Sequence, residues 1–257
     1  MPYSKPPPER STLKEILGIV TSVLAELKRF YGLSRTIFQP SYDPKRWSSR
    51  TQLESKQGYL DSWQAESNIF LYESISRFNL KKVLEIGSNS GNRLFQIAQS
   101  RPDVDFVGVD LNREAISLGN QKALELGLEN LNFYCADIRE KNFTSFLKNG
   151  SFDTLISWAT LIYLHPVFVK RFFFAVDQSS ISQICFIEQN SSIGSQILLR
   201  GLPIAGGPNW ARNYDECLKR FCRNPEFICE TSNVPKEIWN PCGGKATLII
   251  GERNKSK

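Results

Sequence analysis

Short apolar runs that alternate with helical patterns fill the middle of this chain, from Lys81 to Glu188, and constrain its fold more than any other feature. A strand followed by a helix and a second strand forms a parallel pair joined by a right-handed crossover. Repetition of that unit gives a parallel sheet with helices on both faces. The pattern predicts strands at 83–86, 106–109, 131–135, 154–157 and 184–188, and helices at about 91–99, 113–126, 144–147 and 166–177.

The last third of the chain departs from this alternation. A predicted helix at about 211–221 is followed by two apolar runs, at 227–234 and 246–253, with no helical pattern between them. Strands joined without a helix pair in antiparallel fashion. The sequence therefore predicts an α/β fold, with a doubly wound, mostly parallel seven-stranded sheet, helices on both faces and an antiparallel last strand.

The first 64 residues follow another pattern, and we interpret them as an N-terminal extension and helical cap that precedes the main domain at 65–257. Residues 12–30 have apolar side chains at helical intervals after a capping-box spacing, which predicts an amphipathic helix. A second helix is predicted from about 61 to 77.

Composition places the chain among ordinary globular proteins, since 41% of its residues are hydrophobic and 23% are charged. No apolar run reaches the roughly 20 residues of a membrane helix, and the first residues lack the apolar segment of a secretory signal. We therefore expect a cytoplasmic protein without membrane contact. The formal net charge of +6 favours acidic partners only weakly. Six cysteines without a C-x-x-C pair predict buried reduced thiols and no metal site.

The stretch that most clearly predicts chemistry joins the first strand of the alternating region to its first helix. It reads Glu-Ile-Gly-Ser-Asn-Ser-Gly from Glu85 to Gly91. Glycine adopts backbone angles that other residues avoid and lets a ligand approach the main chain. The helix N-terminus that follows supplies unpaired N–H donors. Because ligands bind at the carboxyl ends of the strands in open α/β sheets, this stretch predicts a small-molecule pocket.

Two acidic residues stand at the ends of the next two strands. Asp110 ends the second strand, where a carboxylate suits a ribose diol, and Asp137 ends the third, where it can accept from an exocyclic amine while Ile138 packs on the ring. Either acid alone is explained equally well as a helix N-cap or a loop charge. Their positions at successive strand ends favour a nucleoside site.

Together these residues resemble the class I S-adenosylmethionine-dependent methyltransferases. The glycine stretch is similar to the E/D-x-G-x-x-x-G loop of that family, Asp110 to its ribose-binding acid, and Asp137 with Ile138 to its adenine-flanking pair. The resemblance covers about residues 65–253 and implies the strand order 3-2-1-4-5-7-6. It implies S-adenosyl-L-methionine as cofactor, bound by Glu85, Gly87, Ser88, Asn89, Gly91, Asp110, Leu111, Asp137, Ile138, Ser157 and Trp158.

Two other nucleotide-binding families fit less well. A dinucleotide dehydrogenase requires G-x-G-x-x-G, whereas three residues separate Gly87 from Gly91, so the glycine that approaches a pyrophosphate is missing. A P-loop is excluded, because no G-K-[ST] occurs in the sequence.

With such a cofactor, the main task of the protein is to align the acceptor with the S–CH3 bond and to exclude water. A general base is needed only if the acceptor carries a proton at working pH. His165, the single histidine, follows the fourth strand and is the candidate base, with a helix N-cap as the alternative. Tyr163 is the second catalytic candidate, with a core-facing residue as its alternative.

Several residues are candidates for ligand contacts at the remaining strand ends. Trp158 either covers the adenine or the sulfonium or is a core aromatic. Glu188 ends the fifth strand and either orients an amine acceptor or is a solvated loop acid. Arg212 and Tyr214 are candidate acceptor contacts, with a helix-start salt bridge as the alternative. Trp63 is a candidate acceptor-side residue in a lid.

The predicted function is transfer of a methyl group to a small-molecule acceptor by in-line displacement. A nucleic-acid methyltransferase is the first alternative, which the net charge permits. Residues 157–160, Ser-Trp-Ala-Thr, argue against it, since amino-group nucleic-acid methylases resemble [DNS]-P-P-[YFW] there. A non-catalytic protein that retains the fold is the second alternative. The acceptor atom, the need for a base and the oligomeric state stay open.

Overall fold

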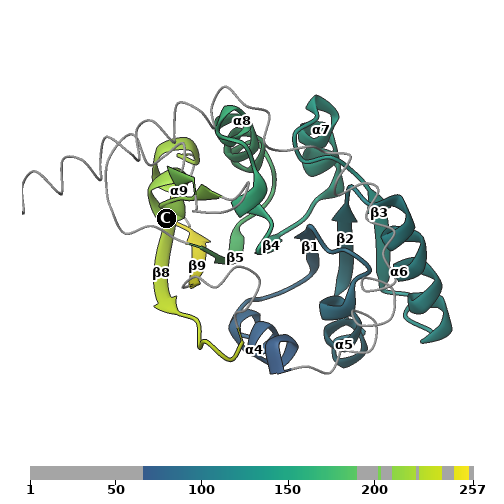
Figure 1. The fold of residues 1–257 in the computed structure, drawn as a ribbon. Helices are drawn as coiled ribbons and strands as arrows, with labels where there is room; N and C mark the ends of the chain where they lie inside the picture. Colours follow the sequence, from purple (N-terminus) through teal and green to yellow (C-terminus); the bar gives the residue numbers. More distant parts are fainter. Residues whose placement is uncertain (1–65, 190–201, 204–209, 224–225, 239–245, 255–257) are drawn as a thin grey trace, which may run out of the picture. The chain divides into compact units, whose positions relative to one another are not determined.

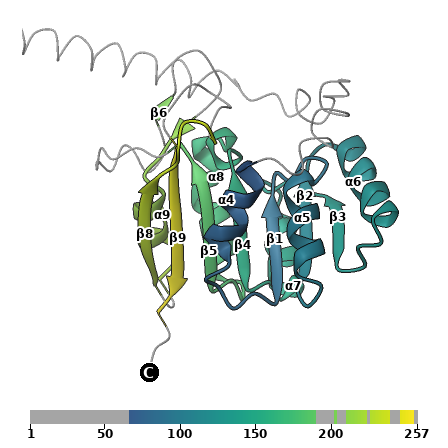
Figure 2. The same cartoon turned by 90° about the horizontal axis from the view of Figure 1, so that it is seen from below.

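The computed structural model describes residues 66–189, 202–203, 210–223, 226–238 and 246–254. Its centre is a seven-stranded sheet with the order β3-β2-β1-β4-β5-β9-β8, which Figure 2 shows with the strands side by side. The strands of this sheet are β1 (Lys82–Ile86), β2 (Asp105–Asp110), β3 (Leu131–Cys135), β4 (Thr154–Trp158), β5 (Gln183–Glu188), β8 (Phe227–Asn233) and β9 (Thr247–Arg253).

The strand directions agree with the predicted fold. Strands β1 to β5 pair in parallel, whereas β9 pairs antiparallel with both β5 and β8. The predicted order 3-2-1-4-5-7-6 is therefore confirmed, with β9 as the antiparallel seventh strand of this sheet. A separate two-stranded sheet pairs β6 (Leu202–Pro203) with β7 (Trp210–Ala211).

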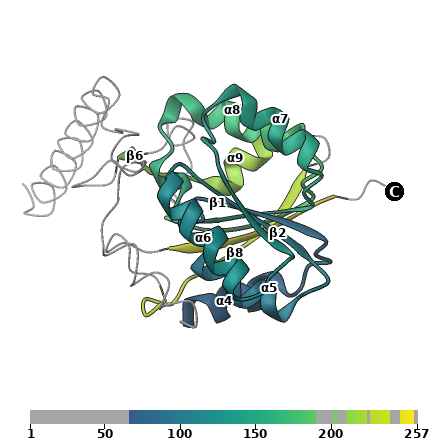
Figure 3. The same ribbon diagram turned by 90° about the vertical axis from the view of Figure 1, so that its right-hand side faces the viewer.

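Helices cover both faces of the seven-stranded sheet. Figures 1 and 3 show α7, α8 and α9 on one face and α4 and α5 on the other. Helix α6 packs along β3 and β2, and its buried side chains belong to the same core as those of α4 and α5. The helices are α4 (Glu66–Ile75), α5 (Asn92–Ser100), α6 (Arg113–Glu125), α7 (Lys141–Gly150), α8 (Pro166–Asp177) and α9 (Tyr214–Phe221), with the 3-10 turn η1 (Leu161–Tyr163) before α8.

Two helices differ clearly from their predicted bounds. The helix predicted at about 144–147 is longer and spans Lys141–Gly150. The helix predicted at about 211–221 begins at Tyr214, because the Asn213 side chain accepts a hydrogen bond from the backbone N–H of Glu216 and so caps the helix there. The residues before it, Trp210 and Ala211, pair as a strand instead.

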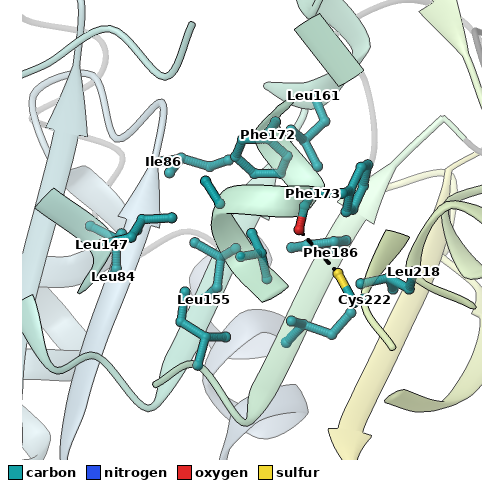
Figure 4. Packing of buried hydrophobic residues seen from close by; sticks show 14 of the residues in the cluster. Leu84, Ile86, Leu147, Leu155, Leu161, Phe172, Phe173, Phe186, Leu218 and Cys222 are labelled. Carbon is teal, nitrogen blue, oxygen red and sulfur yellow. Dashed lines mark hydrogen bonds between the residues drawn. The ribbon is translucent and has the colours of Figure 1, made fainter. Parts of the chain in front are cut away.

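Apolar side chains from the sheet and from α7, α8 and α9 form one of two buried cores, shown in Figure 4. In it, the Cys222 thiol donates to the carbonyl of Phe173 at 3.3 Å. Cys185, Cys217 and Cys222 are buried free thiols, as predicted, but Cys135 is exposed, so the prediction of a buried thiol is wrong there. Its strand β3 is at the edge of the sheet, where side chains have fewer neighbours.

The amino-terminal edge of the sheet is fastened by one carboxylate. The Asp153 Oδ2 accepts from the backbone N–H groups of Lys81 and Lys82 at 3.0 and 2.6 Å. This joins the start of β1 to the start of β4. The predicted ligand residues lie at the opposite, carboxyl edge. The N-terminal extension and helical cap proposed for residues 1–64 lies outside the described residues.

Candidate functional site

The loop between β1 and α5 is held in an unusual backbone conformation. Gly87, Asn89 and Gly91 have φ angles of 69°, 51° and 85°, in the left-handed region that favours glycine. The N–H groups of Gly87 and Ser88 both donate to the carbonyl of Val109, at 2.7 and 3.0 Å. The loop is therefore tied to β2, at the point where the strand order reverses between β1 and β4.

The two glycines are also required by packing within the protein. A Cβ at Gly87 would lie 2.0 Å from the Thr160 Oγ1, and a Cβ at Gly91 would lie 2.0 Å from the Phe133 Cζ. From the sequence alone, the approach of a ligand to the main chain explains these glycines. The structure adds a second reason, because the space beside Gly87 holds the side chain of Thr160, which follows β4, and the space beside Gly91 holds that of Phe133 in the middle of β3.

Asp110 fastens the same loop from the end of β2. Its Oδ2 accepts from the Asn89 N–H at 3.0 Å, and its Oδ1 accepts from the Asn112 N–H at 2.8 Å. Burial raises the pKa of this carboxyl, and the backbone donors together with Arg93 oppose that rise. The side chain stays partly exposed, and each oxygen has a further lone pair, so the carboxylate retains capacity for a ligand hydroxyl.

Glu85 is fully buried at the other side of the loop. Its Oε1 accepts from the Arg93 Nε at 2.7 Å, and the Arg93 guanidinium lies 5.4 Å from the Trp158 ring. Burial raises the pKa of Glu85, and Arg93 partly offsets this. Its Oε2 has no hydrogen-bond partner among the described residues. Because the side chain is 0% exposed, it presents no surface to a ligand, and the predicted direct contact of Glu85 with the cofactor does not hold in this structure.

Trp158 takes the core position that was its alternative interpretation. It is 6% exposed and belongs to the core beneath α4 and α5. Its ring contacts the Arg93 guanidinium. The cation that contacts the Trp158 ring in this structure is therefore Arg93.

Asp137 is at the predicted strand end, but its carboxylate is engaged by an arginine. The Arg139 side chain donates to both oxygens, with its Nη2 2.5 Å from Oδ2, and the Arg139 backbone N–H donates to Oδ1. The Arg171 side chain donates to the Arg139 carbonyl, and both guanidinium groups lie over the Phe168 ring. The next residue, Ile138, packs against the core.

Glu188 is not the solvated loop acid that sequence alone suggested, because it is fully buried. Its Oε1 accepts from the Ser157 hydroxyl at 2.5 Å and from the N–H groups of Thr160 and Leu161 at 3.0 Å, and its Oε2 accepts from the Ile162 N–H at 3.2 Å. Both oxygens are thus engaged within the protein, and the expected orientation of an acceptor by Glu188 does not hold in this structure. Ser157 is likewise buried and directed at Glu188.

Arg212 and Tyr214 are also placed differently from the expectation. They are 1% and 0% exposed, so neither presents a surface to an acceptor. Arg212 donates to the carbonyls of Leu161, at 2.6 Å, and Leu164. Burial raises the pKa of Tyr214 well above its ordinary value, and the charge of Glu188 adds to the rise. The predicted acceptor contacts are therefore wrong: Arg212 supports the turn after β4 from below the surface, and Tyr214 packs in the core.

His165 caps α8, in line with its alternative interpretation. Its Nδ1 accepts from the Val167 N–H at 3.4 Å, and its ring lies 5.6 Å from the Trp210 ring. Burial lowers the pKa of this imidazole, and the charge of Arg212 lowers it further. The lone pair of Nδ1 is engaged by this cap, so the neutral ring carries its proton on Nε2, and the lowered pKa makes the imidazole a weaker base than a free histidine. Tyr163 is half-buried in η1, two residues earlier.

Sequence reasoning missed three residues that shape the site. Thr160, Arg93 and Arg139 contact the glycine loop, Glu85 and Asp137 respectively. Arg139 follows Asp137 by two residues, a spacing that permits a local ion pair and gave a usable signal. Thr160 and Arg93 gave none, since their contacts depend on how strands and helices pack.

One predicted acceptor-side residue, Trp63, lies outside the residues that the structure describes. Within the described part of the chain, no three His, Cys, Asp or Glu side chains are grouped to hold a metal ion. A search of the same residues finds no helix with the length and apolar character needed to cross a membrane.

Comparison with known families agrees with this geometry. A family model described as Methyltransferase domain matches residues 78–189. The stretch runs from just before β1 to just after β5 and includes the glycine loop, Asp110, Asp137 and Glu188.

Curated proteins similar to this chain include two tRNA (guanine-N(7)-)-methyltransferases. The one from Lactobacillus gasseri is 28% identical over 111 residues, which are 43% of this chain and 50% of that protein. The one from Synechococcus sp. (strain JA-3-3Ab) is 27% identical over 161 residues, 63% of this chain and 58% of that protein. The matched stretch spans about half the length of each of these two relatives.

Solved structures show the same fold at low sequence identity. Magnesium protoporphyrin IX methyltransferase from Synechocystis PCC 6803, solved with bound SAH, aligns with a TM-score of 0.54 and 14% identity over 91% of this chain and 100% of that chain. The [4+2]-cyclase SpnF aligns with a TM-score of 0.53 and 12% identity over 74% and 82%. At such identities the likeness supports the fold alone.

Proposed function

We propose that this chain, whose residues 78–189 belong to the class I methyltransferase family, transfers a methyl group from S-adenosyl-L-methionine to a small-molecule acceptor. The observation that carries the proposal is the glycine loop. Three left-handed residues, a helix N-terminus and the Asp110 carboxylate meet at the carboxyl edge, where the strand order reverses.

The residues present fit this cofactor. Asp110 would accept from the ribose hydroxyls with its remaining lone pairs. Glu85 is 0% exposed and would support the glycine loop through Arg93 rather than contact the cofactor. Asp137 and Ile138 would flank the adenine, with Arg139 fixing the Asp137 carboxylate in place. When bound, the cofactor supplies a methyl group on a sulfonium, which is a good leaving group.

The contribution of the chain is to hold reactants rather than to activate them. Its loop between β1 and α5 is tied at Val109 and Asp110, so little backbone has to be ordered on binding. Pre-organisation of this kind lowers the entropic part of the barrier. His165 lies beside the turn after β4 and is the side chain proposed to accept a proton if the acceptor carries one, which would require its Nδ1 to release the Val167 N–H that it caps in this structure.

A tRNA guanine is the second candidate acceptor, and the curated relatives favour it. Their likeness to this chain is partial, and each side chain that we assign to cofactor binding lies within residues 78–189. The match to that stretch therefore does not identify the methyl acceptor. We therefore keep the small-molecule acceptor as the proposal and make tRNA an outcome of its test.

The cofactor is tested by calorimetric titration of S-adenosylhomocysteine into three proteins: wild type, Asp110→Ala and Asp153→Ala. Asp153 is the matched control, because it also accepts from two backbone N–H groups but at the opposite edge of the sheet. We expect binding by wild type and Asp153→Ala, and loss of at least tenfold in affinity for Asp110→Ala, about the value of one charged hydrogen bond. No binding by wild type would refute the proposal.

The acceptor is tested by incubating the wild type with methyl-labelled cofactor and either bulk unmodified tRNA or a small-molecule extract. Label in the small-molecule fraction supports the proposal. Label at N7 of guanine in the tRNA would replace it with the second candidate. Because SpnF shares the fold and its printed name is that of a cyclase, product analysis has to show a transferred methyl group and not merely consumption of an acceptor.

A further inference from the structure

The turn that follows β4 is held at both ends by buried, oppositely charged side chains from distant parts of the chain. It runs from Thr160 to Leu164 and contains η1. Its first N–H groups point to the Glu188 carboxylate at the end of β5, and two of its carbonyls accept from the Arg212 guanidinium, which precedes α9.

A single helical turn has little stability of its own. It closes few internal hydrogen bonds and leaves orphan N–H groups at one end and orphan carbonyls at the other. Here the carboxylate satisfies three successive N–H groups, and the guanidinium donates to the carbonyls of Leu164 and of Leu161, the latter of which also accepts from the Leu164 N–H. Both charges are buried, so removal of either would leave its partner groups unsatisfied at a large cost.

The turn has two neighbours in the proposed site. At its start, the Thr160 side chain lies against Gly87, where a Cβ would come within 2.0 Å of Oγ1. At its end, His165 caps α8 and lies within the field of Arg212. The position of the turn thus sets both how the glycine loop is closed and where the imidazole lies.

We propose that Glu188 and Arg212 are positioning residues that clamp this turn against the glycine loop and hold His165 in place. The expected effect of the clamp on cofactor binding rests on the proposed function. The contacts of the clamp with the turn do not depend on that function. Ser157 completes it, since its hydroxyl donates to the Glu188 Oε1 at 2.5 Å.

The test uses the single histidine of the chain as a reporter. His165 gives one set of imidazole signals in a proton NMR titration of the intact protein. We expect Glu188→Gln to raise the pKa of His165 toward its ordinary value, because a released turn exposes the ring. Removal of the Glu188 charge without movement would lower that pKa or leave it unchanged, so the sign separates the two causes.

Asp153→Asn is the matched control, as it removes a carboxylate that accepts backbone N–H groups away from the turn. It should destabilise the protein without moving the His165 titration. If Glu188→Gln does not fold, Ser157→Ala retains the charge and should give a smaller shift in the same direction. An unchanged His165 titration in the folded Glu188 or Ser157 variant, or an equal shift in Asp153→Asn, would overturn the clamp.

The consequence for the cofactor is measured separately with S-adenosylhomocysteine by calorimetry. Affinity should fall by roughly tenfold in Glu188→Gln and stay within about twofold in Asp153→Asn. Equal affinity in wild type and Glu188→Gln would overturn the link between the clamp and the glycine loop. If wild type binds no S-adenosylhomocysteine, the proposed function fails, while the histidine titration still decides whether the clamp exists.

Discussion

Substitution of Gly91 separates backbone strain from steric conflict in the glycine loop. Its φ is 85°, and a Cβ there would lie 2.0 and 2.3 Å from two atoms of the Phe133 ring. Gly127, after α6, has a similar φ of 66° but nothing within 4 Å of its Cβ position. Alanine at Gly127 therefore costs the strain alone, whereas alanine at Gly91 costs strain and overpacking.

The expected magnitudes follow from these distances. Left-handed backbone costs a non-glycine residue about 1–2 kcal/mol, which is the expected loss for Gly127→Ala. Overpacking adds about 1–3 kcal/mol, so Gly91→Ala should lose about 2–5 kcal/mol of unfolding free energy. Phe133→Leu removes the outer ring atoms that conflict with the new methyl group. In that background the cost of Gly91→Ala should fall to the cost measured for Gly127→Ala.

The assay is urea unfolding followed by circular dichroism, on the two glycine variants, Phe133→Leu and both double variants. The double-mutant cycle cancels the cost of Phe133→Leu itself and leaves the coupling between the two sites. We expect a coupling of about 1–3 kcal/mol for Gly91 with Phe133 and none for Gly127 with Phe133. A cost at Gly91 no larger than at Gly127, or additive behaviour of Gly91 and Phe133, would refute the packing argument.

Three further predictions concern other parts of the molecule. Because the pKa of His165 is lowered in the folded state, the unfolded state binds more protons below about pH 6.5, and the free energy of unfolding falls there as the pH falls. His165→Asn, which keeps a helix cap, should reduce the loss of unfolding free energy between pH 7.5 and 5.5, measured by urea unfolding. Glu230→Gln should leave the urea midpoint unchanged, since its pair with Arg77 is exposed. Among the cysteines of the described residues, iodoacetamide should label Cys135 before the buried Cys185, Cys217 and Cys222, as mapped by peptide mass spectrometry, and Cys135→Ser should remove that label.

The fold of the main domain was predictable because its information is local. The spacing of apolar residues along the chain distinguishes strands from helices. The predicted bounds of the parallel strands and of the helices between them therefore lie within a few residues of the observed bounds. The ends of β1, β2 and β3 follow from the same pattern, and with them the places of Gly87, Asp110 and Asp137. The sequence alone therefore predicts which edge of the sheet holds the ligand site.

Only the tertiary structure decided what each charged side chain contacts. Glu188 meets Ser157 across 31 residues of sequence, and Arg212 meets Leu161 across 51. Sequence assigned both to an exposed acceptor site, because charge is usually solvated, whereas packing buried them against orphan N–H and carbonyl groups that no local pattern reveals. Periodicity thus determines which elements form, while the burial that sets the role of a charge arises only once those elements pack together.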